Sequence, residues 1–179
     1  MTAAEVTTIV PTLPVDTLTT RTEFYRSVGG LDAHIRPELQ AIIVPASSTL
    51  GAIMMPAELA ARVRLHMQKQ GIRSGPIISH PRSSRWTFLV RPDMDIDVQT
   101  YAGMFRIQVT VARPGTEIAL PSPIRRHQQF RCWTQPPTDR YRPSGSVALA
   151  AIDACRPPSE WTHMALRHNP TTVPRRSTS

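Results

Sequence analysis

Residues 51–90 read GAIMMPAELAARVRLHMQKQGIRSGPIISHPRSSRWTFLV, and the expected architecture is built outward from this stretch. Pro56 is typical of a helix start, because the first helical N–H needs no partner. Gly71 is typical of a helix end, because glycine readily adopts the left-handed conformation of a C-terminal cap. Between them, apolar side chains recur every four residues, at Leu59, Val63 and Met67. The sequence therefore predicts a helix with one apolar face turned to the core.

Short apolar runs on both sides of this helix predict strands. Residues 41–44 and 51–54 are two such runs with a short polar connection, which is typical of a hairpin. Residues 76–79 and 85–90 are two more, and the polar residues 80–84 between them are expected to form the turn.

The following segment predicts further strands. Residues 105–111 alternate apolar and polar side chains, which is the period of a half-buried strand. Pro114 and Gly115 are expected to turn the chain, and residues 117–120 to return it. Residues 130–133 indicate one more short strand.

A last helix is expected over residues 147–155, capped by Ser144 or Ser146. Its inward side chains are predicted to be Val147, Ala151 and Ile152. The order of hairpin, helix, strands and helix predicts an α+β fold, with an antiparallel or mixed sheet and two main helices packed on one face. The predicted core comprises Leu59, Val63, Met67, Trp86, Phe88, Ile107 and Val109.

The ends of the chain lack this patterning. Residues 1–23 are rich in Thr, Val and Pro without a period, which predicts a disordered N-terminal arm. Residues 24–156 are expected to form a single domain, and residues 157–179 a flexible basic tail. Trp161, Met164 and Leu166 are the side chains through which part of that tail could dock.

Composition narrows the class of protein. The chain has 179 residues, 40% of them hydrophobic, and a net charge of +8 in which all basic residues except Lys69 are Arg. Such a charge favours polyanionic partners: nucleic acid, an acidic protein face or an anionic membrane surface. The alternative is compositional, because a GC-rich coding sequence also favours Arg over Lys.

Several classes of protein are not indicated. No run approaches 18 apolar residues, so no membrane span is expected. Cys132 and Cys155 do not have the spacing of a zinc site. The first residues lack the features of a signal peptide, so a cytoplasmic location with reduced thiols is expected. The glycines form neither a P-loop nor a dinucleotide fingerprint, and no catalytic triad is evident.

Three groups of polar residues are candidate sites. The first is acidic: Asp93, Asp95 and Asp97 would share one face of a strand and could hold Mg²⁺, which prefers oxygen ligands. The alternative is a solvated loop after residues 86–90.

The second candidate group surrounds a turn, where amides, hydroxyls and guanidinium groups could hold a phosphate. It comprises His80, Arg82, Ser83 and Arg85, and the alternative is an ordinary polar turn.

The third group is basic and aromatic. Its arginines could contact backbone phosphates, and its Trp could stack on an unpaired base. The group comprises Arg125, Arg126, Arg131, Trp133, Arg140 and Arg142. The alternative places Trp133 in the core and leaves the arginines solvated.

Five short motifs carry a family resemblance. They are Gly-x-Ile-Met-Met-Pro at 51–56, Gly-Pro-Ile-Ile at 75–78, Trp-Thr-Phe-Leu-Val at 86–90, Ala-Leu-Pro-Ser-Pro at 119–123 and Arg-Pro-Ser-Gly at 142–145. The chain resembles, over residues 24–156, small actinobacterial proteins named for the N-terminal region of bifunctional DNA primase/polymerases. A subset with Ile-Ile-Ser-His-Pro-Arg before Arg-Trp-Thr-Phe-Leu is similar too, and its members often carry the label of a DNA-directed RNA polymerase subunit beta.

The resemblance implies a primase/polymerase-like fold and an association with nucleic acid. Primases of this broad class are expected to place an Asp-x-Asp/Glu metal motif before a Ser-x-His motif. Here the acidic set follows the histidine, and Ser79 and His80 are adjacent. The resemblance therefore implies a degenerate, non-catalytic domain.

Three hypotheses follow from the sequence. The leading one is a non-catalytic domain associated with nucleic acid or with a nucleic-acid polymerase. The second is a protein–protein adaptor with a basic surface for an acidic partner. The third is a nucleotidyltransferase that uses the Asp93–Asp97 set, and only this one requires a cofactor, Mg²⁺.

Overall fold

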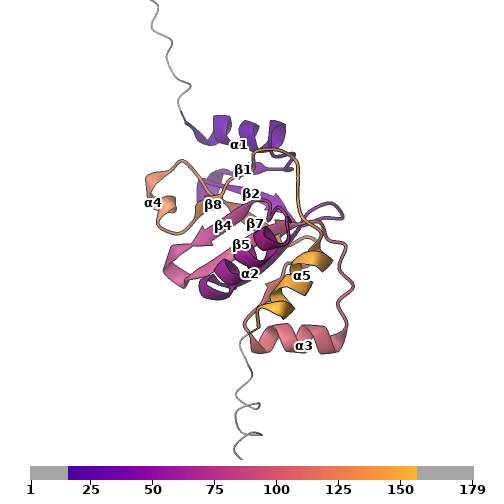
Figure 1. Ribbon diagram of the computed structural model, residues 1–179. Coiled ribbons are helices and arrows are strands. Elements are labelled where there is room, and N and C mark those ends of the chain that lie inside the picture. Colours follow the sequence, from indigo (N-terminus) through magenta and orange to yellow (C-terminus); the bar gives the residue numbers. More distant parts are fainter. Residues whose placement is uncertain (1–15, 157–179) are drawn as a thin grey trace, which may run out of the picture.

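A computed structural model describes residues 16–156, except for the side chains of Arg125 and Arg126. Its strands form two antiparallel sheets, and its helices pack mainly on one of them (Figure 1). The helical elements are α1 (Leu18–Ser27), η1 (Pro37–Leu39), α2 (Ala57–Lys69), η2 (Pro81–Ser83), α3 (Val98–Arg106), α4 (Arg125–Gln128) and α5 (Gly145–Ala154). The strands are β1 (His34–Arg36), β2 (Ala41–Pro45), β3 (Gly51–Pro56), β4 (Ile77–His80), β5 (Arg85–Val90), β6 (Thr110–Val111), β7 (Glu117–Leu120) and β8 (Cys132–Gln135). The predicted α+β class with an antiparallel sheet is confirmed.

The five-stranded sheet forms the middle layer, in the order β6-β3-β5-β4-β8. Successive strand residues point to opposite faces, so each strand contributes to two cores. On β5, Phe88 packs among the helices, whereas Leu89 packs among residues of the three-stranded sheet β1-β2-β7. Ile77 and Ile78 of β4 divide in the same way. The result is three layers: helices, a central sheet and a second sheet.

The helical layer confirms the apolar face predicted for residues 56–71. Leu59 is 4% exposed, and Val63 and Met67 are fully buried. Helix α2 packs against α5, as Figure 1 shows, and Ala151 and Ile152 of α5 are buried as predicted. The prediction for Val147 is wrong, because the Ser144 cap starts the helix at Gly145 and leaves Val147 37% exposed.

The second sheet is covered by α1, which occupies part of the predicted arm. The prediction that residues 1–23 are disordered is wrong for residues 18–23. The hydroxyl of Thr17 accepts from the N–H of Thr20, and the side chain of Thr20 bonds back to Thr17, so a capping box starts the helix. Tyr25 is fully buried at its other end. Residues 1–15 and the expected tail lie outside the described residues.

Two predicted hairpins are wrong. Strands β2 and β3 belong to different sheets: β2 pairs with β1 and β7, and β3 pairs with β5 and β6. Strand β7 therefore returns onto β2 instead of onto the strand before it. The hairpin of β4 and β5 is confirmed, with Ile77 opposite Phe88 and His80 opposite Arg85.

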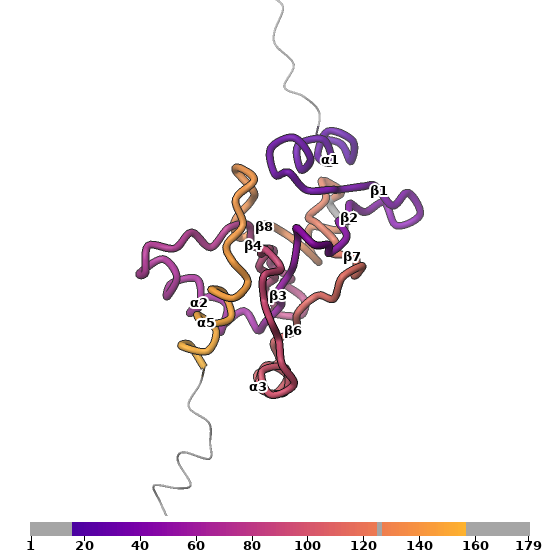
Figure 2. Tube along the Cα trace, turned by 90° about the vertical axis from the view of Figure 1, so that its right-hand side faces the viewer, coloured from indigo at the N-terminus to yellow at the C-terminus, as the bar shows by residue number. Residues whose placement is uncertain are grey.

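The strand predicted over residues 105–111 is also largely wrong. Helix α3 extends to Arg106, and only Thr110 and Val111 pair with β3. The carboxylate of Asp97 accepts the N–H of Thr100 at 2.7 Å and caps α3. This cap starts a helix that continues through the first residues of the alternating run. Figure 2 shows α3 as a separate coil at the end of the sheet.

Both cysteines are free, with Cys132 exposed and Cys155 half-buried. Between residues 16 and 156, no helix combines the length and the apolar character needed to cross a membrane.

Candidate phosphate-binding site

The pairing of β4 with β8 brings together two residues that the sequence places in different groups. Ser79 lies opposite Cys132 in this antiparallel pair. His80 and Arg131, the next residues outward, are therefore neighbours across the strands. The Nε2 atom of His80 lies 2.8 Å from the hydroxyl oxygen of Thr87 on β5, which orients the imidazole.

His80 and Arg131 line a cavity of about 320 Å³ between the two sheets. Its floor is apolar and comes from β3 and β7, whereas its polar lining comes from hydroxyl-bearing and charged side chains. These are His80, Thr87, Thr110, Thr116, Glu117 and Arg131. A small apolar cavity with a few convergent polar groups is typical of a ligand site.

The charges in the cavity are not balanced. Glu117 is its acidic residue and forms an ion pair with Arg36. Arg131 is half-buried, and within the described part of the chain its guanidinium makes no ion pair or side-chain hydrogen bond. Burial lowers the pKa of Arg131 below its ordinary value. A desolvated cation without a counter-ion is costly, so an anion bound here would be stabilised.

His80 responds to the same environment. Burial lowers the pKa of His80, and the positive charges of Arg131 and Arg85 lower it further. The imidazole is therefore neutral at pH 7 and presents a hydrogen-bonding ring beside a permanent cation.

One more cation lies on η2, the turn that directly follows His80. The guanidinium of Arg82 on η2 lies over the ring of Phe130, 4.9 Å from its centroid. Phe130 directly precedes Arg131 and is 42% exposed. His80, Arg82 and Arg131 are called the anion corner below.

Two residues of the predicted phosphate group have other roles. Arg85 donates to the backbone oxygen of Gln108 at 2.6 Å, which holds the guanidinium against the chain. The hydroxyl of Ser83 lies 3.4 Å from the backbone oxygen of His80, at the exposed turn. Of that group, His80 lines the cavity, and Arg82 lies on η2 against the ring of Phe130.

The described members of the predicted basic–aromatic group contact different parts of the chain. Arg125 and Arg126 belong to α4, but their side chains lie outside the described residues. Arg142 donates to the backbone oxygens of Gly29 and Gly30, at 2.8 and 3.0 Å. Arg140 packs on Gly30, where a Cβ atom would fall 2.8 Å from its Cγ. Arg140 and Arg142 therefore contact the segment that follows α1.

Trp133 is part of the packing rather than an exposed stacking surface. Its indole N–H donates to the hydroxyl of Tyr25 at 2.8 Å, and that hydroxyl donates to the backbone oxygen of Pro121 at 2.6 Å. The two rings meet edge to face.

The acidic group lies in the loop between β5 and α3, not on a strand. The carboxylate of Asp93 accepts from the N–H of Gly145 at 2.7 Å and so caps α5, whereas Asp97 caps α3. The two carboxylates serve different helices. Among residues 16–156, no three His, Cys, Asp or Glu side chains are grouped so that they could hold a metal ion.

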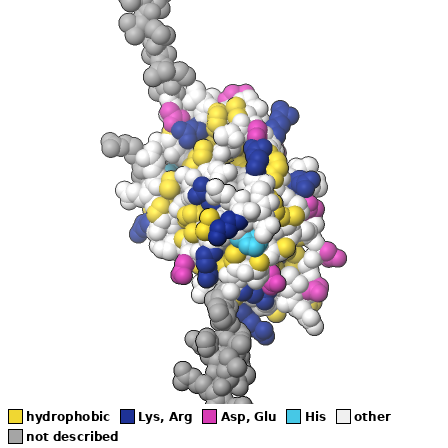
Figure 3. Space-filling view, viewed as in Figure 1, with side chains coloured by type: hydrophobic (Ala, Val, Ile, Leu, Met, Phe, Trp, Pro, Cys, Tyr) yellow, Lys and Arg dark blue, Asp and Glu magenta, His cyan; other side chains and the backbone are white. Residues whose placement is uncertain are grey.

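On the face that Figure 3 shows, basic side chains are spread out and interleaved with acidic ones. Net charge alone does not define a patch on this face. The local arrangement at the anion corner is therefore the better guide to a site.

No sequence pattern indicated that Thr110, Thr116 and Glu117 line the cavity. Their positions depend on which sheet β6 and β7 join, and this is set by long-range pairing.

Comparison of the chain with protein-family models, curated proteins and solved structures finds no match. The resemblance to primase/polymerase-like proteins stays a prediction.

Proposed function

We propose that this chain is a non-catalytic domain that binds nucleic acid, with a backbone phosphate held at the anion corner. The observation that carries the proposal is Arg131, a half-buried guanidinium without a carboxylate partner in the described part of the chain. A phosphate oxygen is a suitable counter-ion, because guanidinium offers two parallel N–H donors to it. The family resemblance and the net charge of +8 support the same class of ligand.

The surroundings of Arg131 favour single-stranded over double-stranded nucleic acid as the ligand. The guanidinium of Arg82 lies over the ring of Phe130, so a cation and an aromatic ring lie side by side. Basic grooves with exposed aromatic rings bind unpaired bases by stacking while arginines follow the backbone. A nucleic-acid strand whose backbone phosphate pairs with Arg131 would place one of its bases near Phe130.

A binding role also agrees with the acidic residues. Asp93 and Asp97, which the nucleotidyltransferase hypothesis assigns to Mg²⁺, are engaged as helix caps. The chemistry that remains at the anion corner is charge pairing and hydrogen bonding.

Fluorescence anisotropy with labelled single- and double-stranded oligonucleotides tests the proposal. We expect Arg131→Gln to weaken binding at low salt by about tenfold or more, since a charge-assisted hydrogen bond contributes about 1.5–3 kcal/mol. The matched control is Arg64→Gln, which removes one charge from the exposed face of α2 and should change the affinity by less than about twofold.

Two results would contradict the proposal. One is an equal loss of affinity in both variants, which would mean that only overall charge matters. The other is no binding of either polymer at low salt, after which the adaptor hypothesis and an acidic protein partner would take precedence.

A further inference from the structure

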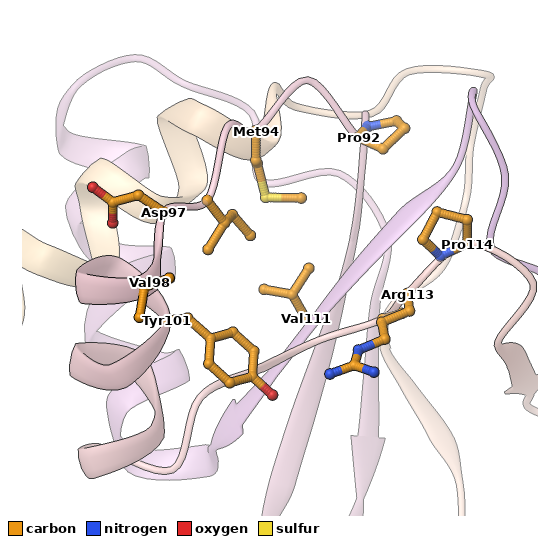
Figure 4. Close-up of a pocket in the computed structure, with 10 residues that line it drawn as sticks. Pro92, Met94, Asp97, Val98, Tyr101, Val111, Arg113 and Pro114 are labelled. Carbon is orange, nitrogen blue, oxygen red and sulfur yellow. The ribbon is translucent and has the colours of Figure 1, made fainter.

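A second cavity, larger than the one at the anion corner, lies beside α3. It has a volume of about 530 Å³ and is enclosed by the β5–α3 loop, the first turn of α3 and the segment between β6 and β7. Figure 4 shows side chains from these three elements turned toward a common open space. Its walls are mostly apolar and include Met94, Ile96, Val98, Tyr101, Val111 and Pro114.

Two polar groups meet at one end of this cleft. In Figure 4 the hydroxyl of Tyr101 and the guanidinium of Arg113 are directed toward each other from opposite walls. Across residues 16–156, the guanidinium of Arg113 makes no ion pair or side-chain hydrogen bond. The carboxylate of Asp97 points away from the open space and caps α3. The cleft therefore combines apolar walls with one unpaired cation.

The apolar side chains at the mouth are unusually exposed. Val98 is 85% exposed and Tyr101 is 48% exposed, although each also lines the cleft. Neighbouring exposed apolar side chains of this kind are typical of a binding groove, because covering them with a ligand removes apolar surface from water.

The cleft is held open by hydrogen bonds on both sides. The loop on one side is tied to α5, where the Ser146 hydroxyl donates to the backbone oxygen of Asp93 at 2.6 Å. The segment on the other side is tied to β3 by a bond of 2.8 Å from the N–H of Ala112 to the oxygen of Ala52. The cleft is thus preformed, as ligand sites usually are.

We propose that this cleft binds a small amphipathic acid, a molecule with an apolar body and one carboxylate or phosphate monoester group. The apolar body lies between Met94 and Val111. The acid group pairs with Arg113 and accepts a hydrogen bond from Tyr101. Arg113 supplies the charge complementarity, and the walls supply the apolar contact area.

Isothermal titration of the full chain with three ten-carbon probes tests this site. Decanoate and decyl phosphate carry the two acid groups, and decanol carries none. We expect at least one acid to bind about tenfold or more tightly than decanol, and the tighter acid identifies the headgroup. Arg113→Gln should reduce the affinity for that acid to the level of decanol, and Arg113→Lys should restore part of it.

Two controls separate this site from the rest of the molecule. Arg106→Gln removes an exposed charge from α3 outside the cleft, and Arg131→Gln removes the charge of the anion corner. Neither should change the affinity for the acid, so this inference does not depend on the proposed function. Three results would overturn the proposal. They are equal affinity for decanol and the acids, an Arg113→Gln variant that binds the acid as tightly as the wild type, and no binding of either acid.

Discussion

The protonation of His80 depends on its neighbours. Burial lowers its pKa, and the charges of Arg131 and Arg85 act in the same direction. In the unfolded chain the pKa returns to its ordinary value of about 6.5. Between the two values the unfolded chain binds more protons, so the free energy of unfolding falls as the pH decreases through that interval.

We therefore expect His80→Gln to flatten the pH dependence of stability just below pH ~6.5, because the titrating group is gone. Urea unfolding at several pH values measures this. A variant with the same pH profile as the wild type would show that His80 is not held in its neutral form by the fold.

The hydroxyl of Tyr25 stabilises the fold through two hydrogen bonds. It accepts from Trp133 and donates to the backbone oxygen of Pro121, so it links α1 to β8 and to the segment after β7. Tyr25→Phe removes only the hydroxyl and leaves the partly buried indole N–H of Trp133 and the buried backbone oxygen of Pro121 without this partner. We expect a loss of about 1–3 kcal/mol in the free energy of unfolding. A loss below about 0.5 kcal/mol, typical of a surface site, would contradict the buried hydrogen bonds.

At the scale of elements, α2 is held mainly by its apolar face. Leu59→Ala should cost about 2–5 kcal/mol, because it leaves a cavity between α2 and the sheet. Leu65→Ala on the same helix is the control, since Leu65 is 51% exposed and its loss should cost less than about 0.5 kcal/mol. Denaturant unfolding compares the two, and similar losses would contradict the assignment of the buried face.

Helix α5 depends on a cap from a distant segment. The pKa of Asp93 is lowered: desolvation opposes ionisation, but hydrogen bonds from Ser144, Ser146 and Gly145 and the charge of Arg91 outweigh it. The stabilisation is thus present above the ordinary pKa and is lost as the pH falls through the lowered one.

We expect Asp93→Ala to cost about 0.5–2 kcal/mol at neutral pH, as is usual for the loss of an N-terminal cap. Asp93→Asn should retain part of the cap but lose the acid-dependent part. Thermal unfolding at neutral and acidic pH distinguishes them. A variant Asp93→Asn that keeps the acid dependence of the wild type would contradict the role of the charge.

The elements that sequence reasoning predicted well are those with local signals. The α2 face, the β4–β5 turn and the Ser144 cap of α5 each depend on residues close together in the chain. The N-terminal cap of α3 at Asp97 is also a local signal. It was overlooked because the alternation over residues 105–111 favoured a strand. Helix α1 was missed because its apolar periodicity is weak, although Thr17 and Thr20 form its capping box.

At the scale of the whole molecule, the layers were not predictable, because β2 and β3 lie near each other in the chain but pair in different sheets. The candidate site likewise depends on strand pairing between distant parts of the chain. His80, Arg82 and Arg131 were all predicted as ligand-binding residues, but in two separate groups. Only the β4–β8 register places His80 beside Arg131, and only the stacking of the two sheets creates the cavity behind them.

The dependence of nucleic-acid binding on salt tests the central proposal most directly. Each phosphate contact releases counter-ions, and contributes about −0.7 on a single strand and −0.9 on a duplex to the slope of log affinity against log salt. The variant Arg82→Gln/Arg131→Gln should therefore have a shallower slope than the wild type by about 1.4–1.8. The control Arg62→Gln/Arg64→Gln, with the same loss of charge on the exposed face of α2, should keep the wild-type slope. An unchanged slope in the anion-corner variant, or the same reduction in the control, would contradict phosphate binding at this site.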